Sequence, residues 1–340
     1  RDQPGKQASW ASAGIIATKI PRGWAPATLL NNLSVSLWPR LADELRAETG
    51  MDIEYRENGT LIPAFSPDEA DELRREIAPL RQAGVEAELV EGAALLDAEP
   101  ALGPAVVAGQ LLPGGNVENR RAVRALELAL RRAGVEVVAG AQVNAVLSSS
   151  RRVTGVRTSE GDEHRADVVV LAAGSWSGRV PGVDPPIPVV PQRGQILALA
   201  NPDRPLRRVV LKPEDPYLVP RVDGRVIVGA TREFAGYDRS LTAGGVAWLL
   251  GSAIEMVPAF AGSVIHELWT GFRPVSADGV PIIGPANLEG LFYATGHGAS
   301  GVGPAPGTAA LLAALVFGKE PPVPAESFRP DRFRPGVLTP

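Results

Sequence analysis

The segment Val168-Val169-Val170-Leu171 is apolar at every position. A strand without a polar face is usually covered on both sides, as in a parallel sheet flanked by helices. Elsewhere, segments 217–219 and 226–228, joined through Asp223-Gly224, show the half-buried alternation of an antiparallel hairpin. Because the two kinds of segment interleave along the chain, we expect a mixed α/β (α+β) fold whose domains are discontinuous in sequence.

The clearest helix lies near the start of the chain. Leucines recur every four residues from Leu33 to Leu45, which predicts an amphipathic helix over 25–48 that Gly50 ends. Ser66-Pro67-Asp68-Glu69 is typical of a helix start, so a second helix is predicted from there to Gly84.

The other expected elements are shorter. Asn58-Gly59 favours a tight hairpin between segments 53–55 and 60–65. A helix is predicted over 120–133, followed by a strand at 135–138. Near the end of the chain, a strand at 291–294 leads into a glycine-rich segment and then a helix that continues through Phe317.

Composition excludes several classes of protein and site. The chain has 340 residues with a net charge of −4, which provides no basic surface for nucleic acid or an anionic membrane. Its longest apolar stretch, residues 309–317, is about half of what a membrane span requires. With no Cys and three His, disulfides and thiolate metal sites are excluded and a zinc centre is not expected. No signal peptide is recognisable, so we expect a soluble, cytoplasmic protein.

Gly296, Gly298 and Gly301 match the spacing G-x-G-x-x-G between a predicted strand and a predicted helix. A dinucleotide-binding motif would need a second strand that ends in an acidic residue about twenty positions later. Glu320 lies near that distance, but a helix and prolines fill the interval, so we reject this interpretation. What remains is a glycine-lined helix start, which favours an anion or an electron-rich carbonyl. The alternative is a strand-to-helix turn whose glycines only allow tight packing.

Two further segments are candidates for ligand contact. Residues 8–16 combine small and aliphatic side chains, which allows a flat ligand to approach the backbone but also suits an ordinary helix start. Arg273 lies between an apolar strand and a turn at Asp278-Gly279. A guanidinium in apolar surroundings requires an anionic partner, which is either a ligand carboxylate held by two parallel hydrogen bonds or an Asp or Glu of the chain.

Seven segments in this order and spacing resemble the D-amino acid oxidase family of FAD-dependent oxidoreductases, most closely its glycine oxidase branch. They are Ala8-Ser9 with Ala13-Gly14, residues 172–178, Arg193-Gly194-Gln195, residues 217–221, residues 228–231, residues 271–274 with 278–284, and residues 294–297. The resemblance covers about residues 1–330. It implies an FAD-binding, doubly wound parallel-sheet domain formed by 1–47, 111–186 and 270–340, and an antiparallel-sheet substrate-binding domain formed by 48–110 and 187–269.

The resemblance also implies the binding residues. Tyr217 and Arg273 match the Tyr and Arg that hold the substrate carboxylate in glycine oxidases. Non-covalent FAD, the only attachment expected without Cys, would contact a set from several segments: Arg1, Ala8, Ser9, Ala13, Gly14, Ile15, Val143, Gly174, Trp176, His297, Gly298, Ala299, Ser300, Gly301, Val302 and Gly303. Of these, Val143 would contact adenine through its backbone. Residues 297–303 would form the helix start that stabilises the negative charge of the reduced flavin.

The sequence departs from the family in two places. Family members begin with a strand, a true G-x-G-x-x-G, a helix and a second strand ending in a ribose-binding acid, whereas this sequence begins at Arg1, beyond the place of that acid. Roughly thirty-five residues of the FAD site are therefore expected to be absent, which would leave an apolar strand edge. The second departure is Ala299, where glycine oxidases carry an Arg. Residues 298–301 look more like those of FAD-dependent amino acid dehydrogenases.

These observations predict an enzyme that deaminates a small amino acid or amine oxidatively. The resemblance implies hydride transfer from Cα to flavin N5, an imine that hydrolyses to a keto acid, and reduction of O2 to H2O2. No side chain is assigned as catalytic acid or base, because the substrate has to lose only its ammonium proton before the transfer. The expected partners are the small-molecule substrate and O2 or another acceptor, and a homo-oligomer is compatible with the sequence.

Two alternatives stay open at this point. The first is an FAD-dependent D-amino acid or imino acid dehydrogenase that uses an acceptor other than oxygen, which the segment around Ala299 favours. The second is a truncated product without flavin and without activity.

Overall fold

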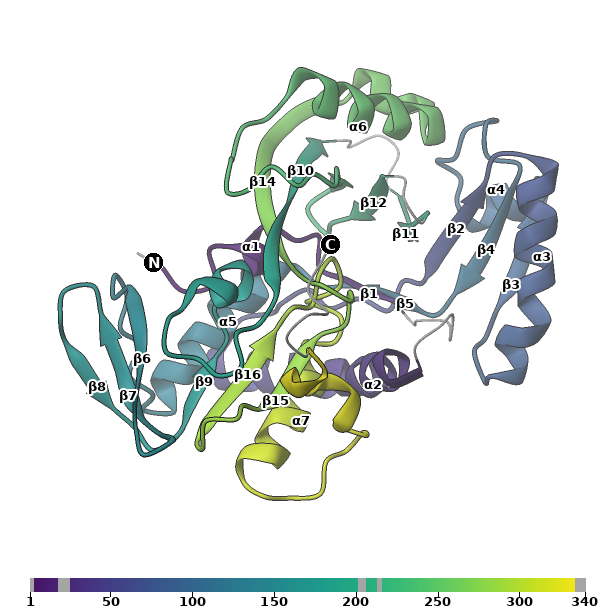
Figure 1. Ribbon diagram of the computed structural model, residues 1–340. Coiled ribbons are helices and arrows are strands. Elements are labelled where there is room, and N and C mark those ends of the chain that lie inside the picture. The colour runs from purple at the N-terminus through teal and green to yellow at the C-terminus, as the bar shows by residue number, and fades with distance from the viewer. Residues whose placement is uncertain (1–2, 18–24, 201–205, 213–215, 334–340) are drawn as a thin grey trace.

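The computed structural model describes residues 3–17, 25–200, 206–212 and 216–333, and it shows helices packed around several β-sheets (Figure 1). The α-helices of these residues are α1 (Ala8–Ala11), α2 (Ala25–Thr49), α3 (Pro67–Gln82), α4 (Gly92–Ala98), α5 (Asn119–Arg132), α6 (Ala243–Met256) and α7 (Ala305–Val316). Short 3-10 helices cover Gly174–Arg179, Pro258–Gly262, Glu326–Phe328 and Pro330–Arg332. The expected mixed α/β class is confirmed.

The largest sheet has eight strands in the order β14-β10-β13-β12-β11-β2-β4-β3, and its only parallel neighbours among the described residues are β11 and β2. The strands are β2 (Thr60–Ala64), β3 (Glu88–Glu91), β4 (Ala108–Leu112), β10 (Val189–Ala200), β11 (Val209–Val210), β12 (Tyr217–Pro220), β13 (Arg225–Gly229) and β14 (Val264–Ser276). In Figure 1, α6 lies over β10 and β14, while α3 and α4 flank β2 to β4. The predicted hairpin of segments 217–219 and 226–228 is confirmed as β12 and β13.

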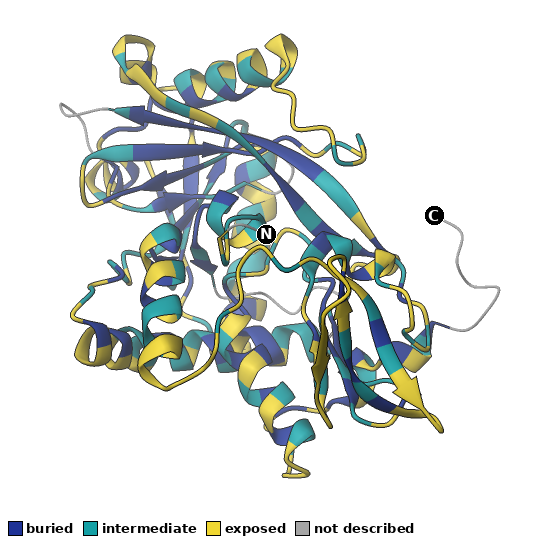
Figure 2. Cartoon of the chain, turned by 90° about the vertical axis from the view of Figure 1, so that its left-hand side faces the viewer, coloured by how far each residue is buried: buried dark blue, intermediate teal, exposed yellow. Residues whose placement is uncertain are grey.

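Alternation along β10 gives this sheet two different faces. Leu197 and Leu199 are buried against α6, in a core that includes Leu249. Ile196 and Ala198 point to the opposite side, where they pack with Ala13. Figure 2 shows the strands of the large sheet mostly buried and the outer faces of the helices exposed. The second face is therefore the one that meets the N-terminal segment of the chain.

The remaining strands form smaller sheets around α2, α5 and α7. They are β15 (Ile282–Pro285), β16 (Leu291–Thr295) and β9 (Val169–Leu171) in one sheet, β6 (Val143–Ser149), β7 (Arg152–Thr158) and β8 (Glu163–Arg165) in another, and the pair β1 (Ile15–Ala17) and β5 (Gly114–Asn116). Helices α2 and α7 cross closely because Gly307 has no side chain: its N–H donates to Ser34 Oγ over 2.8 Å, and a Cβ there would lie 2.4 Å from that oxygen.

Most predicted helices form with nearly the predicted bounds. The helices expected over 25–48 and 120–133 are α2 and α5. The helix expected from Ser66 is α3, where Ser66 Oγ accepts a hydrogen bond from the N–H of Glu69. Each prediction rested on a local signal, a repeat or a cap, that the surrounding structure does not override. Every helix in the described ranges is too short or too polar to cross a lipid bilayer.

Three local predictions are wrong. The hairpin around Asn58-Gly59 does not form, because β2 pairs with β4 and β11, and Arg56 forms a bridge with Asn116 instead. Residues 135–138 form no strand, and Val135 and Val138 are exposed. The last helix begins at Ala305, after a loop over 296–304, rather than directly after Gly301.

The apolar strand β9 is covered less than we expected. It pairs in parallel with β16, and within the described residues it has no neighbour on its other edge. Val168 and Val170 are 44% and 40% exposed. The doubly wound parallel sheet is thus represented here by one parallel pair, whose outer edge is apolar.

Arg221, in the turn after β12, connects the large sheet to the N-terminal segment. Its buried guanidinium donates to the carbonyls of Ala13 and Val117 at 3.0 and 2.9 Å, and to the side-chain oxygens of Asn116 and Asn119 at 3.1 and 3.0 Å. Burial lowers the pKa of this guanidinium to about 10. The side chain therefore holds four acceptors that would otherwise be unpaired in the interior.

We expect Arg221→Met to lower the free energy of unfolding by at least about 2 kcal/mol, because hydrogen bonds from a charged group to buried acceptors are lost. Urea denaturation measures this value. The control is Arg225→Met, which removes a guanidinium paired with the half-exposed Asp223 and should change stability by less than about 1 kcal/mol. Equal effects of the two substitutions would show that Arg221 does not pin the segment.

Candidate functional site

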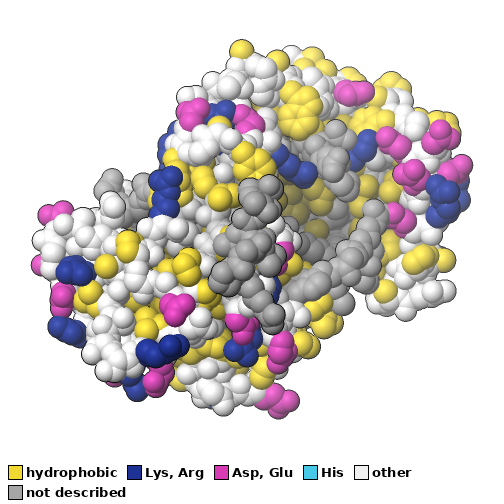
Figure 3. Space-filling model, viewed as in Figure 1, with side chains coloured by type: hydrophobic (Ala, Val, Ile, Leu, Met, Phe, Trp, Pro, Cys, Tyr) yellow, Lys and Arg dark blue, Asp and Glu magenta, His cyan; other side chains and the backbone are white. Residues whose placement is uncertain are grey.

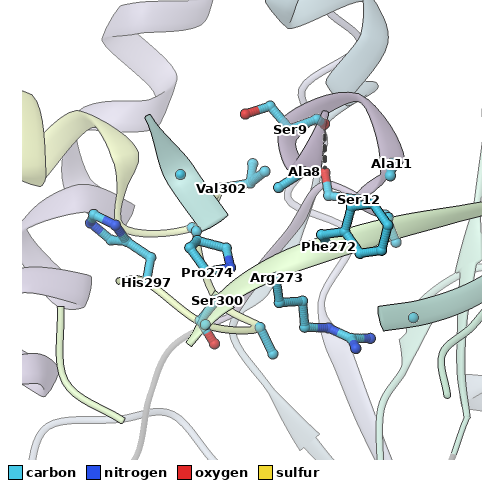
Figure 4. Close-up of a pocket in the computed structure, with 18 of the residues that line it drawn as sticks. Ala8, Ser9, Ala11, Ser12, Phe272, Arg273, Pro274, His297, Ser300 and Val302 are labelled. Atoms are coloured by element: carbon cyan, nitrogen blue, oxygen red, sulfur yellow. Dashed lines mark hydrogen bonds between the residues drawn. The ribbon is translucent and has the colours of Figure 1, made fainter. Parts of the chain in front are cut away.

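A cavity of about 240 Å³ lies where the N-terminal segment, the large sheet and the loop before α7 meet. Apart from Arg273 and His297, the described residues that line it are small or apolar: Ala8, Ser9, Ala11, Ser12, Ala13, Gly14, Ile15, Ala172, Gly174, Gly194, Ile196, Gly271, Phe272, Pro274, Ala294, Thr295, Gly298, Ala299, Ser300, Gly301, Val302 and Gly303. Figure 4 shows α1 on one side of this cavity and Ser300 on another, with Arg273 extending from β14. The molecule is visibly hollowed near the middle of the face in Figure 3, where basic side chains lie at the rim.

The structure brings together most of the residues expected to bind a cofactor or substrate. The cavity lining includes residues 8, 9, 13–15, 174, 273 and 297–303 of the predicted set. Tyr217 lies beside the cavity rather than in its lining, whereas Val143 and Trp176 are elsewhere. Arg1 lies outside the described residues.

Val143 and Trp176 have other surroundings. Val143 begins β6, pairs with Thr158 and is 39% exposed. Trp176 stacks on Tyr237 with ring centroids 5.0 Å apart and meets the edge of Phe272 at 6.1 Å. Trp176 therefore supports the cavity wall through Phe272, a role that its position in the sequence did not indicate.

The N-terminal wall of the cavity requires small residues. Gly14 has a φ of +63°, and a Cβ there would lie 2.0 Å from the carbonyl oxygen of Val117. A Cβ on Gly271 would lie 2.4 Å from the Cβ of Ala11, so α1 can rest directly on β14. The small side chains of this segment thus serve close packing and also leave a flat surface on the cavity side.

The loop 297–303 provides unpaired hydrogen-bond donors. Among the described residues, the backbone N–H groups of Ala299, Gly301, Val302 and Gly303 have no partner. The loop is held from behind, since Trp38 Nε1 donates to the carbonyl of Gly303 over 2.9 Å. A carbonyl or anionic ligand in the cavity could therefore accept from this loop.

The prediction that residues 297–303 form the start of a helix is wrong, because these residues form a loop. Helix α7 begins at Ala305, and the N–H of Gly307 is already satisfied by Ser34. The ring of His297 is bonded through Nε2 to Thr308 Oγ1 at 3.0 Å, in the first turn of α7. The donors at the cavity are consequently loop amides, while the helix lies directly behind them.

Arg273 has no acidic partner in the part of the chain that the structure describes. Its Nη1 donates to the carbonyls of Thr231 at 2.9 Å and of Arg193 at 3.4 Å, while Nε and Nη2 have no protein acceptor. Burial lowers the pKa of this guanidinium, Tyr217 acts in the opposite direction, and the charge of Arg232 lowers it further. Within the described residues, Arg273 thus forms no ion pair with an Asp or a Glu, and an edge of its guanidinium faces no protein acceptor.

Two glycines let Arg273 and Tyr217 reach toward each other. A Cβ on Gly194 of β10 would lie 2.7 Å from Nη2 of Arg273, so the guanidinium lies over that glycine. Similarly, a Cβ on Gly229 of β13 would lie 2.5 Å from the Tyr217 hydroxyl. Since β10 and β13 are neighbours, the two polar groups converge from β14 and β12 on the same face of the sheet.

The Tyr217 hydroxyl is a neutral donor. Burial raises its pKa above the ordinary value, and the positive charges of Arg273, Arg221 and Arg232 only partly oppose this. Among the described residues the hydroxyl has no hydrogen-bond partner. Tyr217 and Arg273 thus present a free O–H and a free guanidinium edge.

A buried polar network fixes residues 231–233, the segment after β13 whose Thr231 carbonyl accepts a hydrogen bond from Arg273. Arg193 is 5% exposed and pairs with Glu233 and Asp238, and Glu233 also accepts from Gln195 and Thr231. Burial alone would raise the pKa of the Glu233 carboxyl, but these hydrogen bonds lower it overall. The network anchors Thr231, whose carbonyl positions the guanidinium.

Sequence reasoning missed the roles of Gly194 and Gly229 and the contribution of Thr231. All three lie in segments that carried the family resemblance, yet their function depends on which residues face them across the sheet. The cross-strand register, which pairs Gly194 with Gly271 and Gly229 with Tyr217, supplies this information.

Comparisons with known proteins identify the family to which the chain is similar. The profile of the family DAO, described as FAD dependent oxidoreductase, matches residues 1–315. The glycine oxidase of Pseudomonas putida is 36% identical over 337 residues, which cover 96% of this chain and 89% of that protein. The D-amino acid dehydrogenase of Methylobacterium nodulans is 32% identical, over 85% of this chain and 70% of its own. The crystal structure of glycine oxidase from Geobacillus kaustophilus has a TM-score of 0.90 and 31% identity, with 97% of this chain and 90% of that chain covered.

We expect Gly194→Ala to displace the Arg273 guanidinium and weaken the binding of a small carboxylate by about tenfold, which corresponds to ~1.4 kcal/mol. Acetate, followed by NMR titration, is a suitable probe. The control is Gly251→Ala in α6, where a Cβ meets nothing within 4 Å. Unchanged acetate affinity in the Gly194 variant would exclude the guanidinium as the anion site.

Proposed function

This chain belongs to the DAO family of FAD-dependent oxidoreductases, and from that membership we propose that it oxidises a small amino acid or amine and reduces O2 to H2O2. The broader assignment to an FAD-dependent amino acid or amine oxidoreductase of the glycine oxidase type follows from the family match and from the relatives. The observation that supports the proposal most is the free guanidinium edge of Arg273 beside a flat cavity.

The residues present fit FAD. A flat ring needs a slot whose walls carry no bulky side chains, and the cavity wall formed by Ala11, Ala13 and Gly14 carries none. The unpaired amides of the loop 297–303 suit the carbonyl edge of a flavin. We therefore assign residues 8–15 and 297–303 to FAD binding. FAD, when bound, supplies a two-electron acceptor.

Arg273 and Tyr217 would bind the substrate carboxylate. Nε and Nη2 of Arg273 form the two-donor edge that matches a carboxylate, and the Tyr217 hydroxyl adds a third donor. Because Nη1 is held by the Thr231 carbonyl, the guanidinium has a fixed orientation. A carboxylate bound there would hold the substrate Cα at a constant position in the cavity, and positioning of this kind lowers an activation barrier substantially.

The cavity contains no side chain that we assign as a catalytic base. Among the described residues that line the cavity, only Arg273 and His297 have titratable side chains, and His297 is bonded to Thr308. The amine therefore has to lose its ammonium proton to solvent. The role that we assign to this chain's residues is binding, orientation and exclusion of water.

A dehydrogenase that uses another electron acceptor is the second candidate. It is supported by Ala299 at the edge of the cavity and by the similarity to a D-amino acid dehydrogenase. Substrate-dependent H2O2 formation in air supports the oxidase. Reduction of an artificial dye acceptor without peroxide would instead favour the dehydrogenase.

We expect Arg273→Ala to raise KM for amino acids about 30- to 1000-fold, or ~2–4 kcal/mol, because the charge-assisted carboxylate bond is lost. Steady-state kinetics with glycine, sarcosine and D-alanine measure this. Arg273→Lys should restore only part of the affinity, since a single ammonium cannot replace the two-donor edge. An unchanged KM in the alanine variant would remove Arg273 from the site.

Cofactor binding can be tested without turnover. The purified chain, incubated with FAD and separated from the free cofactor, should keep flavin absorption and release it on denaturation, because no Cys can form a covalent link. Colourless protein after this treatment would favour the product without flavin and would contradict the proposed function for this chain.

A further inference from the structure

A second hollow of about 380 Å³ adjoins the first cavity. Both are lined by His297, Gly298, Ala299 and Ser300, so the loop forms their shared wall. The second hollow also includes the side chains of Gln192 and Arg232. None of the residues that line either hollow is an Asp or a Glu, so the charges that the described lining presents are positive or absent.

Arg232 reaches this hollow from the strand end beside Arg273. Arg232 lies opposite Gly194, because Glu233 forms a β-bridge with Arg193 and the N–H of Thr231 donates to the Gln195 carbonyl. The Arg273 guanidinium lies over the same glycine. Gln192 pairs with Arg273 in the register and shares its face of the sheet. The two guanidiniums are close enough for the charge of Arg232 to act on Arg273 and Tyr217.

The side chains of Arg232 and Gln192 have no partner within the described residues. The acid next to Arg232, Glu233, is bound to Arg193, Gln195 and Thr231 and is not available to it. Two like charges without an acid between them are costly to hold together, and an anion between them removes that cost.

We propose that Arg232, assisted by the Gln192 amide, binds a second anionic group of the substrate, so that this enzyme prefers amino or imino dicarboxylates over monocarboxylates. The inference rests on the proposed function, since Arg273 and Tyr217 hold the first carboxylate. The second anionic group of the substrate then binds in the second hollow, which Arg232 and Gln192 line. Ala299 lines both hollows, and its side chain is a single methyl group, so this part of the shared wall is thin.

The test compares Arg232→Gln with the parent chain, both loaded with FAD. The substrates are the monocarboxylates glycine and sarcosine and the dicarboxylates aspartate, as both enantiomers, and iminodiacetate. We expect the parent to show a higher kcat/KM for at least one dicarboxylate. The variant should lose about 10- to 100-fold of that value through KM, while glycine and sarcosine change less than about twofold. Arg225→Gln, beside the turn between β12 and β13, is the matched control and should leave all values unchanged.

A binding measurement separates this inference from the proposed function. Succinate and acetate, titrated by calorimetry, should bind the parent with different affinities, succinate more tightly, and Arg232→Gln should make them similar. Equal affinities in the parent, or an equal loss for both probes in the variant, would overturn the role of Arg232. If neither class of amine is oxidised but succinate still binds through Arg232, the proposed function fails while the second anion site stands.

Discussion

A partly buried guanidinium that forms no ion pair with the described part of the chain is the constraint on which this site depends. Arg273 is held by backbone carbonyls on one side and faces a cavity on the other. Removing a charge from water is costly unless an opposite charge compensates for it. Since Arg273 forms no ion pair within the described residues, we propose that a ligand carboxylate binds at the free edge of its guanidinium.

The rest of the fold makes this arrangement possible. The long pair β10 and β14 brings Arg273 over Gly194, and the neighbouring pair β12 and β13 brings Tyr217 over Gly229. Glu233, whose charge acts on Arg273, is itself bound by Arg193 and Gln195. On the opposite wall, Gly14 and Ala11 carry no bulky side chain. The loop before α7 presents backbone amides as hydrogen-bond donors. We propose that a flat acceptor and a small anionic amine bind to separate surfaces within this one cavity.

Local sequence signals predicted α2, α3 and α5 and the hairpin β12–β13, because repeats, caps and turn residues act over short distances. These local signals gave wrong predictions where the pairing of strands distant in sequence determines the structure. The segment before Asn58-Gly59 pairs with Asn116 rather than with β2, and the exposed face of Val170 depends on which elements lie beside β9. In the site, the resemblance pointed to Arg273 and to residues 8–15 and 297–303, which meet in the cavity. The glycines under Arg273 and Tyr217 and the place of Arg232 follow only from register.

A crystal structure of the FAD-loaded chain with bound glycine tests this account most directly. We predict the carboxylate on Nε and Nη2 of Arg273 and on the Tyr217 hydroxyl, with the flavin between α1 and the loop 297–303. A carboxylate bound away from Arg273, or a flavin outside this cavity, would contradict it.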